Sequence, residues 1–96
     1  MPFALRFTDE AAANLADLKQ NNPKKHKKVL ACLGKLESNP KHPGLNSHRF
    51  ESLDAVHGEK VWESYVENQT PSAYRVFWVY GPDPGTLTIL AITPHP

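Results

Sequence analysis

The sequence is poor in cysteine, in glycine and in long apolar runs, and each shortage excludes a class of protein. One of its 96 residues is a cysteine, Cys32, so no disulfide can form within the chain, and no Cys or His pair stands at zinc-finger spacing. No apolar run approaches the roughly 20 residues that a transmembrane helix needs. The segment Met1 to Phe7 lacks the basic and apolar regions of a secretion signal. We therefore expect a cytoplasmic protein that uses neither a metal nor a cofactor and binds no membrane.

What the sequence does contain is typical of a small globular domain. Hydrophobic residues make up 40% and charged residues 22%, and nine prolines against five glycines indicate defined loops rather than low-complexity sequence. A chain of this length buries only about 60 to 65% of its unfolded surface, which is enough for one small core. We expect residues 1–96 to form a single domain, and a disordered tail, a coiled coil and a collagen-like chain are excluded.

The net charge of +1 hides an asymmetry between the two halves of the chain. Residues 1–50 carry nine Lys or Arg against four acids, whereas residues 51–96 carry two against six. One part of the surface is therefore expected to attract phosphate and another to repel it, and the overall charge says little about nucleic-acid binding.

Apolar spacing predicts two helices joined by a tight turn. Thr8 is a good N-cap for the first, and Asp9 and Glu10 in the first turn favour the helix dipole. Pro23 begins the second helix, which ends before Pro40. The residues expected to face the core are Ala11, Leu15 and Leu18 in the first helix and Val29, Leu30, Leu33 and Leu36 in the second.

After the loop 41–47 the apolar period shortens towards two, which indicates strands. With the short apolar run at the start of the chain, the strands are expected at about 2–7, 48–53, 60–67, 73–80 and 86–93. Hairpin-length connections between the last four favour an antiparallel meander. The predicted fold class is α+β: an N-terminal strand, then a two-helix hairpin packed on a mainly antiparallel sheet of four to five strands, whose other face stays partly open.

Arg75 interrupts an otherwise apolar strand that is expected at the centre of the sheet, and a buried arginine needs an anionic partner. One interpretation is a structural ion pair with Glu51, Glu63 or Glu67 on a neighbouring strand. The other is an anion-binding arginine on the open sheet face, where the guanidinium fork suits phosphate.

His95 and Glu51 are candidates for proton transfer. His95 follows the last strand between two prolines, which hold its backbone and suit it to a proton donor. Glu51 lies on the first strand of the meander. A base, a fixed cation and an acid are the groups that a metal-independent ribonuclease needs, because they deprotonate the 2′-hydroxyl, stabilise the phosphorane and protonate the leaving oxygen. The alternative is that both side chains are simply solvated.

The second helix starts with four lysines: Lys24, Lys25, Lys27 and Lys28. Their positive charges at the N-terminus oppose the helix dipole. These lysines, with Arg49, are candidates for contacts to an RNA backbone, and Tyr65 is a candidate for base stacking. The alternative for the lysines is a solvated face. The other strand aromatics, Trp62, Tyr74 and Trp78, are expected in the core.

The order of elements and the segments 61–63, 73–78 and 87–92 resemble the RelE/ParE toxin superfamily, the toxin halves of bacterial type II toxin–antitoxin pairs. The most specific element of the resemblance is Tyr74-Arg75 followed by apolar residues. Within the superfamily the chain resembles the YoeB-type and RelE-type mRNA interferase branch. Positions where RelE-type toxins carry lysines and arginines here read Glu63, Ser64 and Tyr65, which speaks against a RelE-like cationic site.

The resemblance implies a toxin that enters the ribosome and cuts mRNA without a metal, an endonuclease that inhibits translation. Arg75 matches the arginine that stabilises the transition state, His95 the catalytic histidine that acts as general acid in YoeB-type toxins, and Glu51 their general base. The implied partners are a cognate antitoxin, the ribosome and mRNA. Two alternatives stay open: a ParE-like toxin that inhibits DNA gyrase by binding, and an inert relative that only binds its antitoxin.

Overall fold

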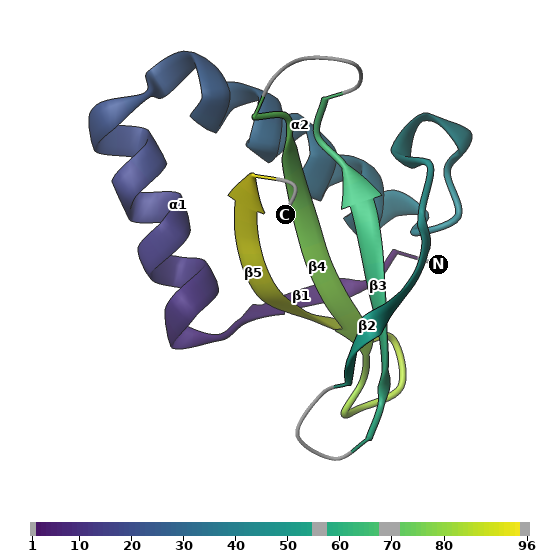
Figure 1. Ribbon diagram of the computed structural model, residues 1–96. Coiled ribbons are helices and arrows are strands. Elements are labelled where there is room, and N and C mark those ends of the chain that lie inside the picture. The colour runs from purple at the N-terminus through teal and green to yellow at the C-terminus, as the bar shows by residue number, and fades with distance from the viewer. Residues whose placement is uncertain (1, 55–57, 68–71, 95–96) are drawn as a thin grey trace.

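The computed structural model describes residues 2–54, 58–67 and 72–94 of the chain. Two helices lie on one side of a five-stranded sheet (Figure 1). The elements in chain order are β1 (Ala4–Phe7), α1 (Asp9–Asn21), α2 (Pro23–Ser38), the short 3-10 helix η1 (Pro43–Leu45), β2 (His48–Asp54), β3 (Lys60–Tyr65), β4 (Tyr74–Tyr80) and β5 (Thr86–Pro94). The α+β fold class expected from the sequence is confirmed, and η1 is an addition to the predicted loop. No helix in the described part of the chain is long and apolar enough to cross a membrane.

Polar side chains set the ends of the helices where the sequence predicted them. The Thr8 hydroxyl accepts a hydrogen bond from the Ala11 amide at 3.1 Å and donates one to the carbonyl of Leu90 on β5 at 2.8 Å. It therefore begins α1 and fastens that end of the helix to the sheet. At the turn, Asn22 closes α1 with its backbone amide and begins α2 with its side chain, which accepts from the Lys25 amide.

The strand order β1-β5-β4-β3-β2 combines a meander with one crossover. Strands β2 to β5 pair antiparallel with their chain neighbours. The crossover is the connection from β1 through both helices to β2, and β1 pairs parallel with the last strand, β5. The β2–β3 register shifts between Arg49 and Asp54, and the β4–β5 register shifts after Phe77. The mainly antiparallel sheet predicted from the sequence is confirmed.

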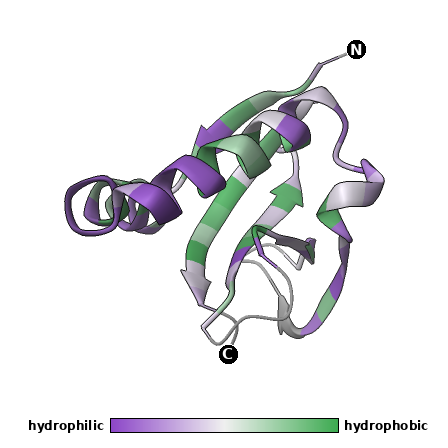
Figure 2. Cartoon of the chain, turned by 90° about the horizontal axis from the view of Figure 1, so that it is seen from above, coloured by the Kyte–Doolittle hydropathy of each residue, from purple (hydrophilic) through white to green (hydrophobic). Residues whose placement is uncertain are grey.

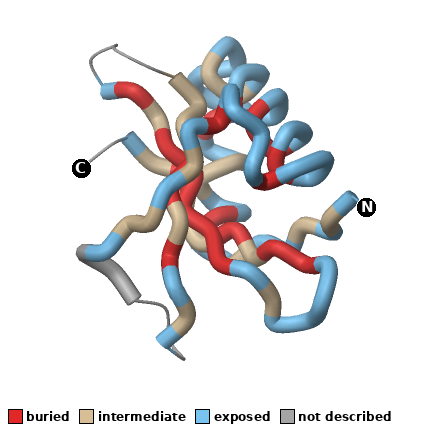
Figure 3. Tube along the Cα trace, turned by 90° about the vertical axis from the view of Figure 1, so that its right-hand side faces the viewer, coloured by how far each residue is buried: buried red, intermediate tan, exposed pale blue. Residues whose placement is uncertain are grey.

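The core is divided by the sheet into two clusters. The larger one lies between the helices and the sheet, where helix residues such as Leu18 and Leu36 pack against Val76 and Trp78 of β4. The smaller one, centred on Val61, Phe77 and Val79, lies on the other sheet face and includes no helix residue. Figures 2 and 3 show hydrophobic and buried residues concentrated along the central strands and on one side of each helix. We call the second face the open face of the sheet.

Two details of the sequence prediction are wrong. Leu30 was expected in the core but is 47% exposed, because Val29 and Leu33 define the buried side of α2 and Leu30 stands about 100° around the helix from Val29. The strand predicted over 60–67 ends at Tyr65, so Glu67 lies in the connection that follows β3 rather than within a strand.

Candidate functional site

On the open face of the sheet, Arg75 lies beside Tyr65 of β3. Arg75 is paired in register with Tyr65 on β3 and with Thr93 on β5, and its chain neighbour Val76 points to the helix side. Because side chains alternate along a strand, Arg75 faces away from the helices. The sequence prediction of an arginine on the open face of a central strand is therefore confirmed in position.

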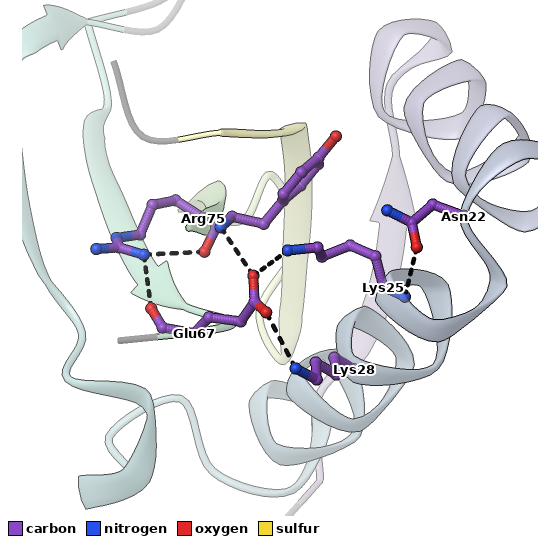
Figure 4. A network of polar contacts seen from close by, with 6 residues as sticks. Asn22, Lys25, Lys28, Glu67 and Arg75 are labelled. Atoms are coloured by element: carbon purple, nitrogen blue, oxygen red, sulfur yellow. Dashed lines mark hydrogen bonds and ion pairs between the residues drawn. The ribbon is translucent and has the colours of Figure 1, made fainter. Parts of the chain in front are cut away.

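The guanidinium of Arg75 is held by carbonyl oxygens and by an aromatic ring. Its Nη1 donates to the carbonyl of Glu67 at 2.7 Å and to the carbonyl of Tyr74 at 3.1 Å (Figure 4). The guanidinium carbon lies 3.7 Å from the centre of the Tyr65 ring, a cation–π contact. The residue is only 7% exposed, and its Nε is buried without a hydrogen-bond partner among the described residues. These contacts fix the plane of the cation without neutralising its charge.

The carboxylate of Glu67 is occupied by α2 and not by Arg75. Its Oε1 pairs with Lys25 and its Oε2 lies 3.1 Å from the Nζ of Lys28 (Figure 4). The hydrogen bond from Lys25 is the main reason that the pKa of Glu67 is lowered from its ordinary value, and Lys28 and the Tyr74 amide act in the same direction. Two of the four lysines at the start of α2 therefore have a structural partner, which fastens the helix to the connection after β3.

His48 and Glu63 form a second pair on the open face. The Nε2 of His48 lies 2.7 Å from Oε1 of Glu63, and its Nδ1 lies 2.9 Å from the carbonyl oxygen of Asn46. The two contacts hold the imidazole ring from both of its nitrogens and so fix its orientation. Glu63 is 1% exposed, whereas the side chain of His48 is 47% exposed. The pair thus presents an oriented imidazole to solvent.

Tyr65 connects this pair to Arg75. The His48 ring meets the Tyr65 ring edge-on at 5.6 Å between centres, and the Arg75 guanidinium covers that same ring. The sequence placed Tyr65 as an exposed platform for a base, but its ring is partly buried and carries a cation. Four side chains therefore form one continuous cluster, which we call the open-face cluster: His48, Glu63, Tyr65 and Arg75.

The other predicted site residues are placed less centrally. Glu51 is exposed on β2, within the segment where the β2–β3 register shifts. Arg49 is partly buried, is paired with Trp62, and has an Nε without a hydrogen-bond partner among the described residues. His95 lies outside the described residues. Lys24 and Lys27 are exposed on α2.

Sequence reasoning missed the His48–Glu63 pair. It considered Glu63 only as a possible partner of Arg75 and assigned no role to His48. The available signal was a histidine and a glutamate on successive predicted strands, but their pairing depends on the β2–β3 register, and an irregular strand pair hides that register from the sequence. Within the described ranges no group of three or more His, Cys, Asp or Glu side chains is arranged to hold a metal ion.

Comparison with known proteins relates this architecture to bacterial and archaeal toxins. No protein-family profile matches the chain, and no curated protein matches it closely enough to count as a relative. Among solved structures, the YoeB/ParE toxin from Agrobacterium tumefaciens matches with a TM-score of 0.73 at 10% identity, over 97% of this chain and 99% of that one. The YoeB dimer from Staphylococcus aureus gives 0.71 at 15% identity and full coverage of both chains. RelE in the RelE–RelB complex from Pyrococcus horikoshii OT3 gives 0.67 at 15% identity, over 98% and 96%.

The likeness extends over nearly the whole length of each chain. The fold is therefore that of YoeB and RelE, and the resemblance to the RelE/ParE superfamily inferred from the sequence is confirmed at the level of fold. One fold hosts different chemistries, so an activity depends on the side chains that the fold presents.

Proposed function

We propose that this chain is the toxin of a type II toxin–antitoxin pair and that it inhibits translation by cutting mRNA on the ribosome. The observation that carries the proposal is Arg75, a cation fixed on the open face of a RelE/ParE-like sheet beside an oriented imidazole. The carboxylate of Glu67 is taken by lysines, so it does not compete with a phosphate for Arg75.

In this proposal Arg75 stabilises the phosphate during attack by the neighbouring 2′-hydroxyl. Charge grows on the non-bridging oxygens in that step, and a cation that is already oriented stabilises it without further reorganisation. Two carbonyl oxygens and the Tyr65 ring hold the guanidinium before RNA arrives.

Proton transfer is assigned to the residues that the family resemblance implies, with His48 as an additional candidate. Glu51 takes the proton of the 2′-hydroxyl, and His95 protonates the leaving 5′ oxygen. His48 is the exposed imidazole of the open-face cluster, and Glu63 and Asn46 orient its ring for donation. A His48→Gln variant that keeps full activity would leave the acid role to His95 alone.

The partners follow from the same proposal. A ribosome-dependent activity places the protein in the cytoplasm, and the exposed lysines of α2, Lys24 and Lys27, are available to the RNA backbone. An antitoxin is the second partner, as RelB is for the archaeal RelE. A groove of about 380 Å³ between β1 and the helices, lined by Phe7, Leu15 and His26 among others, offers it apolar surface.

A test in bacterial cells separates this function from the gyrase alternative. The chain is induced without an antitoxin, and protein synthesis and the supercoiling of a reporter plasmid are followed in the same culture. We expect protein synthesis to stop within minutes while supercoiling is maintained, and an Arg75→Met variant, which keeps the aliphatic volume, to restore synthesis.

Loss of supercoiling before any loss of protein synthesis would contradict the proposal and favour inhibition of gyrase. Normal growth at high expression of folded protein would favour the inert relative. Arg6→Ala is the matched control, because Arg6 is 63% exposed on the edge strand β1 and lies 3.8 Å from Asp83 in a surface ion pair.

A further inference from the structure

A cavity of about 410 Å³ lies on the helix side of the sheet, beside the first half of β3 and the last residues of β4. The loop between α2 and β2 forms one wall, with Lys41, His42 and Asn46. The other wall is aromatic and consists of Trp62, Trp78 and Tyr80. The open-face cluster lies on the opposite side of the sheet, so this cavity is separate from the candidate catalytic site.

The three rings of the aromatic wall pack against one another in a defined arrangement. Trp62 stacks on Trp78 with an interplanar angle of 19° and 5.9 Å between ring centres. Tyr80 meets Trp78 edge-on at 5.0 Å and Trp62 at 6.2 Å. Tyr80 is 41% exposed and Trp62 partly exposed, so planar aromatic surface remains accessible from solvent. Such surfaces stack on the faces of nucleobases irrespective of sequence.

A chain of hydrogen bonds holds the two walls together. The indole nitrogen of Trp78 donates to the hydroxyl of Ser64 at 2.8 Å, and that hydroxyl lies 2.7 Å from the hydroxyl of Ser47 in the loop. Ser47 in turn donates to the carbonyl of Pro40 at 3.0 Å. The loop is thereby fixed against the sheet, so the cavity does not have to be formed when a ligand enters.

The charge around the cavity favours an anion. Lys41 and His42 are exposed at its rim, and no Asp or Glu lines it among the described residues. His42 accepts a hydrogen bond from the Gly44 amide through Nδ1, which leaves Nε2 to carry the ring proton as a donor.

We propose that this cavity binds a nucleotide, with the base against Trp62 and Tyr80 and the phosphate near Lys41. Planar stacking surface together with cationic groups is the combination that recognises a base and its phosphate. The site does not depend on the proposed cleavage of mRNA, because binding here needs neither Arg75 nor the ribosome.

The two tryptophans of the chain both line the cavity, so they report directly on its occupancy. Their indole N–H signals are followed by NMR while the purified protein is titrated with AMP, UMP and a single-stranded RNA trinucleotide. Ribose 5-phosphate serves as the probe that lacks the base, and N-acetyltryptophanamide as the probe that mimics an aromatic side chain of a protein and lacks both base and phosphate. We expect saturable shifts of both indole signals with the nucleotides and none with ribose 5-phosphate.

Variants test the walls separately. Tyr80→Ala is expected to weaken nucleotide binding roughly five- to a hundred-fold, the range typical of losing one base-stacking ring, whereas Tyr80→Phe keeps it. Lys41→Ala is expected to weaken binding, and Lys19→Ala, which removes an exposed lysine on α1, leaves it unchanged. A trinucleotide that binds more tightly than AMP identifies RNA as the source of the ligand, and equal affinity identifies a free mononucleotide.

Two results would overturn the proposal. One is an absence of saturable shifts with any nucleotide although the spectrum shows folded protein. The other is binding of N-acetyltryptophanamide alone, which would assign the cavity to an aromatic side chain of a protein partner. Failure of this titration leaves the proposed mRNA cleavage intact, because that activity is measured with Arg75 variants.

Discussion

At the scale of single residues, the partners of a buried charged side chain determine what that side chain can bind. Arg75 is a clear case: the sequence indicated a need for an anion, and carboxylates on neighbouring strands were the obvious partners. The structure instead gives its guanidinium the carbonyl oxygens of Glu67 and Tyr74 and the ring of Tyr65. Backbone carbonyls carry only partial charge, so these contacts orient the guanidinium without neutralising its charge.

Replacing Glu67 by Gln is expected to destabilise the fold by about 1–3 kcal/mol, because Lys25 and Lys28 lose their shared carboxylate. The side chain of Glu67 is 10% exposed, whereas Lys28 is 59% exposed, so most of the loss is expected from the Lys25 contact. Urea unfolding at pH 7 measures the difference. Glu37→Gln is the matched control, an exposed glutamate on α2, and an equal effect in both variants would contradict the assignment.

The same contact predicts a pH dependence. The pKa of Glu67 is lowered in the folded protein relative to the ordinary value of 4.5. Its contribution to stability is therefore complete above about pH 4.5 and is lost as the pH falls through the lowered folded-state pKa. The difference in unfolding free energy between the natural chain and the Glu67→Gln variant should shrink in that acidic range. A difference that stays constant down to pH 2 would contradict the account.

Cys32 gives a prediction about reactivity. Burial on the inner side of α2 raises the pKa of its thiol to about 12, so very little thiolate is present at pH 8. The thiol also lies 3.6 Å from the Tyr65 carbonyl, to which it can donate. Alkylation by iodoacetamide is expected to be much slower in the native protein than in urea. Equal rates in the two conditions would show that the thiol is accessible.

At the scale of secondary-structure elements, the sequence predicts which helices and strands form and in what order. It does not predict how the strands pair. The helices were predictable because Thr8, Asn22 and Pro23 mark their ends and the apolar spacing marks one face. The strands were predictable from alternation and turn residues. Whether β1 joins β5 in parallel, and where β2 shifts against β3, depends on contacts far apart in the chain, which a local pattern does not encode.

The candidate site shows the same division. Arg75 and its face were predictable, because one charge in an apolar strand is visible in the sequence. The His48–Glu63 pair was not, since it requires the β2–β3 register. Glu51 and His95 rest on the family resemblance: the first is exposed on β2, and the second lies outside the described residues.

The cap of α1 provides a prediction at this scale. Thr8→Ala removes the hydroxyl that accepts a hydrogen bond from the Ala11 amide and donates one to the Leu90 carbonyl. A loss of about 1–2 kcal/mol in unfolding free energy is therefore expected. Thr8→Ser keeps the hydroxyl and should retain most of that stability. Thermal or urea unfolding of the two variants measures it, and equal destabilisation would place the effect in the lost methyl group instead.

At the scale of the whole molecule, the sheet separates two kinds of surface. Its open face presents Arg75 and the His48–Glu63 pair, and its helix side carries the main core and the aromatic cavity beyond the helices. A small domain with one core can present both faces because the sheet is covered by helices on one side only. The account therefore predicts that the two faces are independent: changes in the cavity alter nucleotide binding, and changes in Arg75 alter cleavage.

The central claim is that Arg75 on the open face promotes ribosome-dependent cleavage of mRNA. Primer extension on a defined mRNA, incubated with purified ribosomes and the protein, tests it most directly beside a ribosome-free control and the Arg75→Met, Arg75→Lys and Arg6→Ala variants. We predict discrete cuts that need ribosomes, remain with Arg6→Ala, and fall by roughly a hundredfold or more in rate with Arg75→Met. Undiminished cleavage by a folded Arg75→Met protein, or no cuts with excess natural protein, would contradict the claim.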